Sequence, residues 1–218
     1  WNTIVMTGMT LLIAVPLGIF SAIYLVEYAR PQSRLVRVIR ITTETLAGIP
    51  SIIYGLFGFL AFVLFMGWSY SLLAGVLTLA IMVLPTIIRT TEEALLAVPS
   101  SYREGSFGLG AGKLRTIFKI VLPAAMPGIL SGIILAIGRI VGETAALIFT
   151  SGTSPQAVLG LHDSARTLSV HMYCLLSEGL YTDQAYATAV VLLVIVAGIN
   201  GLSGTVAGKL SGKGRKER

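Results

Sequence analysis

The chain has 218 residues, of which 55% are hydrophobic and only 12% are charged. A soluble domain usually carries about 25% charged residues, so this composition excludes a water-facing surface over a chain of this length. It is typical of polytopic membrane proteins, whose outer surface faces lipid. The formal net charge is +6. The single cysteine, Cys174, excludes an intrachain disulfide and argues against a cysteine-based metal site.

Five apolar stretches are each long enough to cross a bilayer, which takes about 20 residues of helix. We predict spans at about 4–26, 46–66, 71–88, 122–149 and 184–206. The second and third come from one uncharged stretch, which we divide at the turn and interface residues 67–71. The predicted fold class is therefore an all-α polytopic membrane protein, with one transmembrane domain over residues 1–218.

The basic residues between these spans predict the orientation of the chain. Residues 28–48 hold four of them, the loop 89–121 holds five and the segment after Val206 holds five, together 14 of the 16 in the chain. The positive-inside rule places all three segments and the C-terminus in the cytoplasm, and Trp1 outside. An odd number of spans with an outside start predicts that one further span precedes Trp1.

Two segments outside the predicted spans have a composition of their own. The outer segment, about 150–183, contains apolar residues at helical spacing near Met172, which predict an interfacial helix. His171 in that helix stands alone, so we interpret it as a packed or solvent-facing residue rather than a metal ligand. The basic tail 208–218 is expected to be disordered.

The loop 89–121 is the one long cytoplasmic connection between predicted spans. Pro99 is expected to break a helix there, and Ser100 or Ser101 to cap the next one. A glycine cluster precedes Lys113, as in a phosphate-binding loop, but Leu114 stands where that motif needs Ser or Thr. Nucleotide binding by this chain is therefore not expected, and neither a cofactor nor a metal site is predicted.

A different pattern fits this loop. Glu104-Gly105-Ser106 is followed after three residues by Gly110, and after nine more by Ile120-Val121-Leu122-Pro123. The pattern resembles the EAA motif of ABC importer permeases, with Gly-Ser in place of Ala-Ala, a small-for-small change. The resemblance implies a short coupling helix that sits in a groove of an ATPase subunit. The docking residues that it implies are Glu104, Gly105, Gly110, Ile120, Leu122 and Pro123.

Arg139 and Glu143 are the only charges well inside a predicted span. A central Arg costs about 2.5–3.5 kcal/mol on insertion scales, so such residues face the bundle interior or a water-filled path. The two are four residues apart, so a helix would place them on one face. They form either a structural ion pair or an anion site, in which the guanidinium binds a phosphate oxyanion and Glu143 holds it in place. Gly128 and Gly132 form a small-xxx-small pattern that predicts close packing with a neighbouring helix.

Six segments along the chain resemble the phosphate-specific (Pst-type) ABC importer permeases, and the A-type subunit more than the C-type. They are residues 46–58, 98–105, 127–129, 138–145, 167–173 and 177–179. The resemblance implies a six-span type I importer fold in the cell (inner) membrane, with five spans present and the N-terminal one missing. It also implies that Arg139 and Glu143 line the substrate pathway.

The same resemblance implies the partners of the chain. They are a homologous second permease subunit, an ATP-binding subunit dimer and an extracytoplasmic phosphate-binding protein. The predicted function is transport rather than catalysis: the chain forms half of a pathway for inorganic phosphate, and ATP is hydrolysed on partner subunits. The alternatives are an ABC permease for another oxyanion, such as molybdate or sulfate, and an ATP-independent channel or secondary transporter. No nucleic-acid partner is expected, and no nucleophile–base pairing in the spans indicates an enzyme.

Overall fold

The computed structural model of the chain describes residues 1–30, 33–179 and 181–213, with side-chain surroundings up to Gly201. Within these ranges the chain forms α-helices, π-helical turns and connecting segments, and no strand. Four helices are long and apolar enough to cross a membrane, namely Asn2–Tyr28, Leu72–Leu96, Lys113–Gly142 and Thr182–Gly201. The prediction of an all-α polytopic protein is confirmed.

A fifth membrane-length segment is bent. α2 (Arg34–Ala47) and the helix formed by α3 (Ser51–Gly58) and η2 (Phe59–Phe65) meet at an angle of 104°. The bend lies directly before α3, where Pro50 has no backbone N–H with which to continue the hydrogen bonding of α2. The residues expected to connect two spans, 28–48, are thus helical over most of their length.

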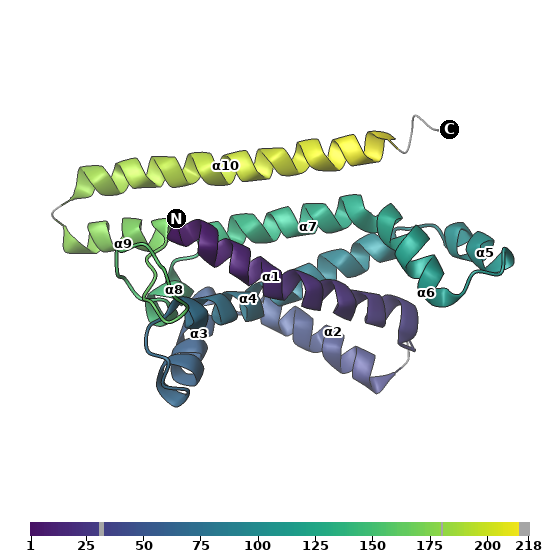
Figure 1. The fold of residues 1–218 in the computed structure, drawn as a ribbon, viewed down its shortest axis with the longest axis horizontal. Helices are drawn as coiled ribbons and strands as arrows, with labels where there is room; N and C mark the ends of the chain where they lie inside the picture. The colour runs from purple at the N-terminus through teal and green to yellow at the C-terminus, as the bar shows by residue number, and fades with distance from the viewer. Residues whose placement is uncertain (31–32, 180, 214–218) are drawn as a thin grey trace.

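α4 (Leu72–Leu96) lies at the centre of the molecule and contacts α1 (Asn2–Ile23), α7 (Leu122–Gly142), α2 and α3 (Figure 1). Its first turn is capped by Ser71, whose hydroxyl accepts a hydrogen bond from the N–H of Ala74. Apolar side chains around its circumference are removed from solvent, so α4 is a core helix. Those with no exposed surface are Ala74, Val76, Leu79, Met82, Val83, Ile87 and Leu95.

The predicted close packing of Gly128 and Gly132 is confirmed. A Cβ atom built on Gly132 would lie 2.2 Å from the hydroxyl oxygen of Thr90, and one on Gly128 would lie 2.7 Å from the Cβ of Ala94. Both partners belong to α4. The two glycines therefore let α7 approach α4 more closely than any side chain would allow.

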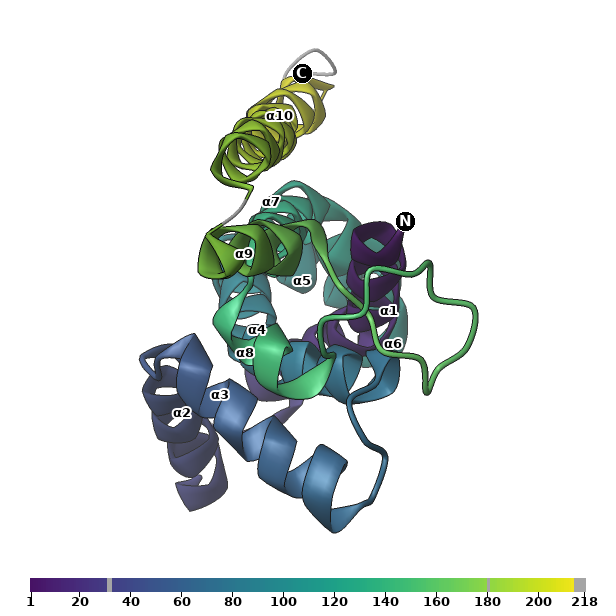
Figure 2. The ribbon, with the colours of Figure 1, turned by 90° about the vertical axis from the view of Figure 1, so that its left-hand side faces the viewer.

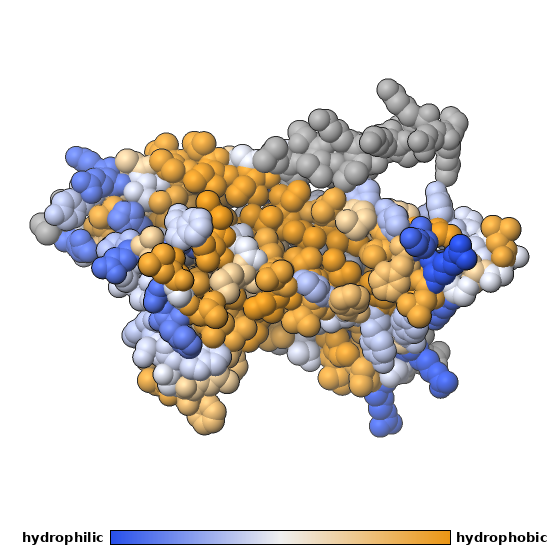
Figure 3. All heavy atoms as spheres, in the orientation of Figure 1, coloured by the Kyte–Doolittle hydropathy of each residue, from blue (hydrophilic) through white to orange (hydrophobic). Residues whose placement is uncertain are grey.

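The remaining elements lie mostly at the two ends of the molecule. They are η1 (Tyr24–Tyr28), α5 (Ser100–Gly108), α6 (Lys113–Thr116), η3 (Ile117–Val121), α8 (Ala145–Thr150), α9 (Leu168–Glu178) and α10 (Thr182–Lys213). We call the end that carries α5 and α6 the loop end. The opposite end carries α8, α9 and the start of α1, as Figures 1 and 2 show. Apolar side chains cover the middle of the surface, and hydrophilic ones gather toward both ends (Figure 3).

The structure differs from the sequence-based expectations at three places. α7 ends at Gly142, and a separate short helix, α8, follows it. The N-cap of α5 is Pro99, with no side-chain hydrogen bond, so the expected capping by Ser100 or Ser101 is wrong. The basic tail is helical as far as Lys213, and residues 214–218 lie outside the described part of the chain.

Candidate functional site

The EAA-type loop, residues 97–116, projects from the loop end as α5, a tight turn and the short helix α6 (Figure 1). Apolar side chains cap its tip without packing against the rest of the chain: Leu109 is 90% exposed and Leu114 is 65% exposed. Phe107 beside them is half exposed. An exposed apolar tip surrounded by charged residues is the composition of a helix that docks into a groove of a partner.

The turn that follows α5 depends on Gly110. Its φ angle is +78°, in the left-handed region that glycine adopts without steric cost. The N–H of Gly110 donates to the carbonyl of Phe107 at 2.9 Å, and the N–H of Ala111 donates to that of Ser106 at 3.1 Å. The backbone of the turn thus requires Gly110, the glycine at the fixed position of the EAA-type pattern.

A buried ion pair fixes the base of this loop to the end of α1. Arg103 donates from Nε and Nη2 to one carboxylate oxygen of Glu27 in η1, at 3.0 and 2.7 Å. It also donates to the carbonyls of Val98 and Leu95, at 2.9 and 3.0 Å. The side chains of Glu27 and Arg103 are 8% and 19% exposed. α5 therefore cannot move without moving η1 or breaking this pair.

The residues expected to dock an ATPase fall into two groups. Glu104 and Gly105 lie exposed on α5, and Gly110 lies in the turn. Leu122, by contrast, packs against the core formed by α1, α4 and α7, and Pro123 occupies the first turn of α7. Ile120 lies between them, half-buried in η3. The second half of the motif thus builds the helix that supports the loop rather than the exposed tip.

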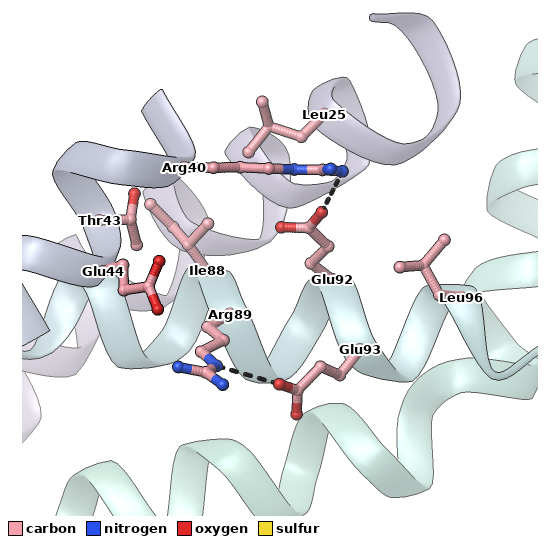
Figure 4. A pocket seen from close by; sticks show the side chains of 9 residues that line it. All are labelled: Leu25, Arg40, Thr43, Glu44, Ile88, Arg89, Glu92, Glu93 and Leu96. Carbon is pink, nitrogen blue, oxygen red and sulfur yellow. Dashed lines mark hydrogen bonds and ion pairs between the residues drawn. The ribbon is translucent and has the colours of Figure 1, made fainter. Parts of the chain in front are cut away.

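A charged cavity of about 300 Å³ lies between α2 and α4 near the loop end (Figure 4). Arg40 of α2 is paired with Glu92 at 2.5 Å, and Arg89 is paired with Glu93 at 3.0 Å. Glu44 also lines this cavity, so carboxylates outnumber guanidinium groups there. Both arginines are already paired with carboxylates, and the third carboxylate would repel an anion. This cavity is therefore a poor oxyanion site.

The structure separates Arg139 from Glu143. Since α7 ends at Gly142, the backbone of Glu143 is extended, with φ −71° and ψ 129°, and the two side chains do not share a helix face. The buried carboxylate of Glu143 instead accepts from the N–H of Ala146 at 3.1 Å and caps α8. Its carbonyl accepts from the hydroxyl of Ser169 in α9 at 2.5 Å. Among the described residues, Arg139 and Glu143 therefore form no ion pair and do not share a helix face, whereas their expected place on the substrate pathway stays a prediction.

Arg139 is left with weak interactions. Its guanidinium makes one long hydrogen bond, 3.5 Å from Nη1 to the hydroxyl of Thr86 on α4. No carboxylate of the described residues lies within ion-pairing distance of it. A half-buried guanidinium with free donors and no counter-ion attracts an anion, and its planar fork matches the oxygens of phosphate.

The family of the chain follows from a match over most of its length. Residues 14–205 match the family described as "Binding-protein-dependent transport system inner membrane component". The chain belongs to this family.

Curated relatives of this inner membrane component are transport permeases. The "Phosphate transport system permease protein PstA 1" of Mycobacterium tuberculosis (strain ATCC 25618 / H37Rv) is 39% identical over 92% of this chain and 65% of its own length. The "Probable ABC transporter permease protein YqgI" of Bacillus subtilis is 36% identical over 84% of this chain and 66% of its own length. The "Phosphate transport system permease protein PstA" of Yersinia pestis is 46% identical over 69% of this chain and 52% of its own. The chain thus spans less than two thirds of the length of these relatives.

Solved structures share the fold. The inward-facing MetNI methionine ABC transporter superposes with a TM-score of 0.74, at 22% identity, over 96% of this chain and 93% of that one. An alginate ABC transporter, solved with an alginate pentasaccharide-bound periplasmic protein, superposes with a TM-score of 0.69, at 20% identity, over 94% of this chain and 77% of that one. The helix arrangement is therefore shared with these two ABC transporters.

Two features of the site escape sequence reasoning. The partners of Arg40 and Arg103 are 52 and 76 residues away along the chain, so no local spacing rule connects them. The contact between Arg139 and Thr86 likewise joins two helices that are distant in sequence. The sequence indicates the Arg40 pair only indirectly: Glu92 and Glu93 stand at the end of α4, and residues 28–48 are basic.

Proposed function

We propose that this chain is a transmembrane permease subunit of an ATP-driven importer for inorganic phosphate, most similar to the A-type subunit. It forms half of the translocation pathway, and ATP is hydrolysed on partner subunits. Arg139 carries the proposal: it is a cation at membrane depth, with free donors and no carboxylate within ion-pairing distance in the described part of the chain. The phosphate-transport permeases among the relatives support the choice of substrate.

Arg139 lines the pathway and stabilises the phosphate anion as it crosses the apolar middle of the membrane. In this proposal Glu143 acts indirectly, because its carboxylate is used to cap α8. Glu143 connects α7 to α8 and thereby positions the last turn of α7, which carries Arg139. Two roles are thus divided between two residues that a continuous helix would have paired.

The EAA-type loop binds the ATPase in this proposal. Leu109, Phe107 and Leu114 fill an apolar groove of that subunit, Glu104 and Gly105 lie beside them, and Gly110 shapes the turn. The loop end then faces the cytoplasm, together with the C-terminus, and the opposite end faces the extracytoplasmic phosphate-binding protein. The basic residues of the loop support this orientation. A second, homologous permease completes the pathway.

Phosphate uptake by an Arg139→Gln variant tests the proposal. The variant is assembled with its partner subunits in vesicles, and uptake of radiolabelled phosphate is measured with and without ATP. We expect uptake to fall more than about tenfold, because the lost charge-assisted hydrogen bonds have no neighbouring replacement. Arg139→Lys serves as the control that keeps the charge and loses the planar fork, with an intermediate rate. An assembled Arg139→Gln transporter that imports phosphate at the wild-type rate contradicts the proposal.

Two measurements separate the alternatives. Competition with unlabelled molybdate and sulfate distinguishes a phosphate importer from one for another oxyanion, since only the true substrate competes at low concentration. Uptake that proceeds equally without ATP indicates a channel or a secondary transporter. We expect neither outcome, because an exposed apolar docking tip has no purpose in a permease that works without an ATPase.

A further inference from the structure

A second cavity, of about 280 Å³, lies at the end opposite the loop end. It is open to the surface and is lined by the first residues of α1, the segment that precedes α9, and the first turns of α9, which Figure 2 shows facing the viewer. None of the described residues that line it is acidic. The polar ones are Asn2, Thr3, Arg166, Thr167 and His171.

Arg166 is the charged residue of this cavity, and its backbone is held on both sides. Its N–H donates to the carbonyl of Ser154 at 3.2 Å, and its own carbonyl accepts from the side-chain amide of Asn2 at 3.2 Å. The side chain is not satisfied in the same way. Its Nε is buried and has no hydrogen-bond partner, and no carboxylate of the described chain lies within ion-pairing distance. Arg166 as a whole is half-buried and lines the cavity, so its terminal N–H groups are donors that a ligand oxygen can reach.

The residues around Arg166 add to its positive character. His171 stands in the first turns of α9, an 11-residue helix whose dipole places partial positive charge at its start. Thr167 accepts from the N–H of Val170, and Thr3 accepts from the N–H of Leu168, so these hydroxyls fix the start of the helix. Among the described lining residues, Arg166 and His171 thus provide donors that are not used within the chain, and no carboxylate stands beside them.

The first turn of α9 also joins this cavity to the membrane site. Ser169, which lies three residues after Arg166 and two before His171, donates to the carbonyl of Glu143 at 2.5 Å. Glu143 directly follows α7, the helix that carries Arg139. The first turn of α9 therefore links the wall of this cavity to the end of α7.

We infer that Arg166 and His171 form an outer binding site for inorganic phosphate, from which the anion passes to Arg139. The inference rests on the proposed function, since it takes this end of the molecule as extracytoplasmic. Arg166 supplies the charged donors and His171 a further N–H, and Asn2 closes the wall by donating to the carbonyls of Gln156 and Arg166. The ligand chemistry, a phosphoryl oxyanion, is shared by the head group of an anionic phospholipid, and the experiment separates the two.

The test is arginine modification of the whole detergent-purified transporter by phenylglyoxal, with each peptide quantified by mass spectrometry. Inorganic phosphate is expected to slow modification of Arg166 and of Arg139. Arg37, which lies exposed on α2, serves as the internal control and should react at the same rate with and without phosphate. Protection of Arg139 without protection of Arg166 overturns the outer site and leaves the proposed function intact. Protection of neither, together with no ATP-driven phosphate uptake, counts against the proposed function itself.

Two further arms complete the experiment. Protection of Arg166 by phosphatidylglycerol but not by inorganic phosphate shows a lipid site and overturns the inference. In vesicle uptake, Arg166→Gln should raise the concentration of phosphate-loaded binding protein needed for half-maximal uptake about tenfold, with little change at saturation. Arg166→Lys should restore part of this difference, and Arg37→Gln should leave it unchanged. An Arg166→Gln transporter with wild-type half-saturation speaks against the site.

Discussion

Removal of Glu27 should release the EAA-type loop from the membrane helices. The Glu27→Ala change takes away the carboxylate that receives two hydrogen bonds from Arg103, at 3.0 and 2.7 Å. The side chain of Glu27 is 8% exposed and that of Arg103 is 19% exposed, so water replaces the lost contacts poorly. Breaking such a pair by removing one partner costs about 3–5 kcal/mol. Arg103 keeps its bonds to the carbonyls of Val98 and Leu95, so we take the lower bound, about 3 kcal/mol.

The assay is amide hydrogen exchange of α5 (Ser100–Gly108) in the purified membrane protein. A loss of about 3 kcal/mol in the local opening free energy speeds exchange about a hundredfold, whereas α4 should keep its protection. Glu93→Ala is the matched control. Its partner Arg89 is an exposed neighbour, with both side chains 63% exposed, and such pairs contribute about 0–1 kcal/mol. Exchange in α5 that changes less than about threefold in Glu27→Ala would refute the argument that this pair holds the loop.

Three further predictions concern single positions. Gly110→Asp forces a side chain into a φ of +78°, and should leave the protein in the membrane but abolish co-purification of the ATPase; Gly112→Asp, with an ordinary φ, should retain it. Gly132→Ala would bring a Cβ within 2.2 Å of the Thr90 hydroxyl and should destabilise the protein by about 1–3 kcal/mol, seen as a lower Tm, whereas Gly8→Ala meets no atom within 4 Å and should not. The N–H groups of Gly160 and Leu159 donate to the Asp163 carboxylate and hold its pKa below the usual 3.8. The stability that this carboxylate gives the outer segment is therefore complete above pH 3.8 and is lost as the pH falls through the lower pKa of the folded state. Exchange at those two amides, corrected for intrinsic rates, should therefore accelerate only in strong acid, and an onset near pH 6 would contradict this assignment.

The sequence predicts the fold class well because the signal is coarse. Long uncharged stretches such as residues 4–26 require a lipid environment whatever their detailed packing. The small-residue pattern at Gly128 and Gly132 predicts a contact because only glycine allows such an approach. The spacing of the EAA-type motif likewise identifies Gly110 because its turn needs a positive φ.

The candidate site is predicted less well because it depends on where helices end. Four-residue spacing places Arg139 and Glu143 on one face only if the helix continues, and it stops at Gly142. The capping of α8 by Glu143 competes with pairing, and a buried N–H at a helix start offers the carboxylate a fixed partner. The same limit hides Arg103 and Glu27, whose pairing depends on how α1 and α5 meet in space.

The central helix α4 can transmit a movement from one end of the molecule to the other. Its 25 residues span about 37 Å at a rise of 1.5 Å per residue, from one end of the molecule to the other. At its start, the N–H groups of Leu72 and Leu73 donate to the carbonyls of Asp163 and Leu161 in the outer segment. At its C-terminal end, the carbonyl of Leu95 accepts a hydrogen bond from Arg103 at the base of the EAA-type loop. A tilt of about ten degrees imposed at one end would shift the other by about 6 Å, enough to open or close a passage for an anion.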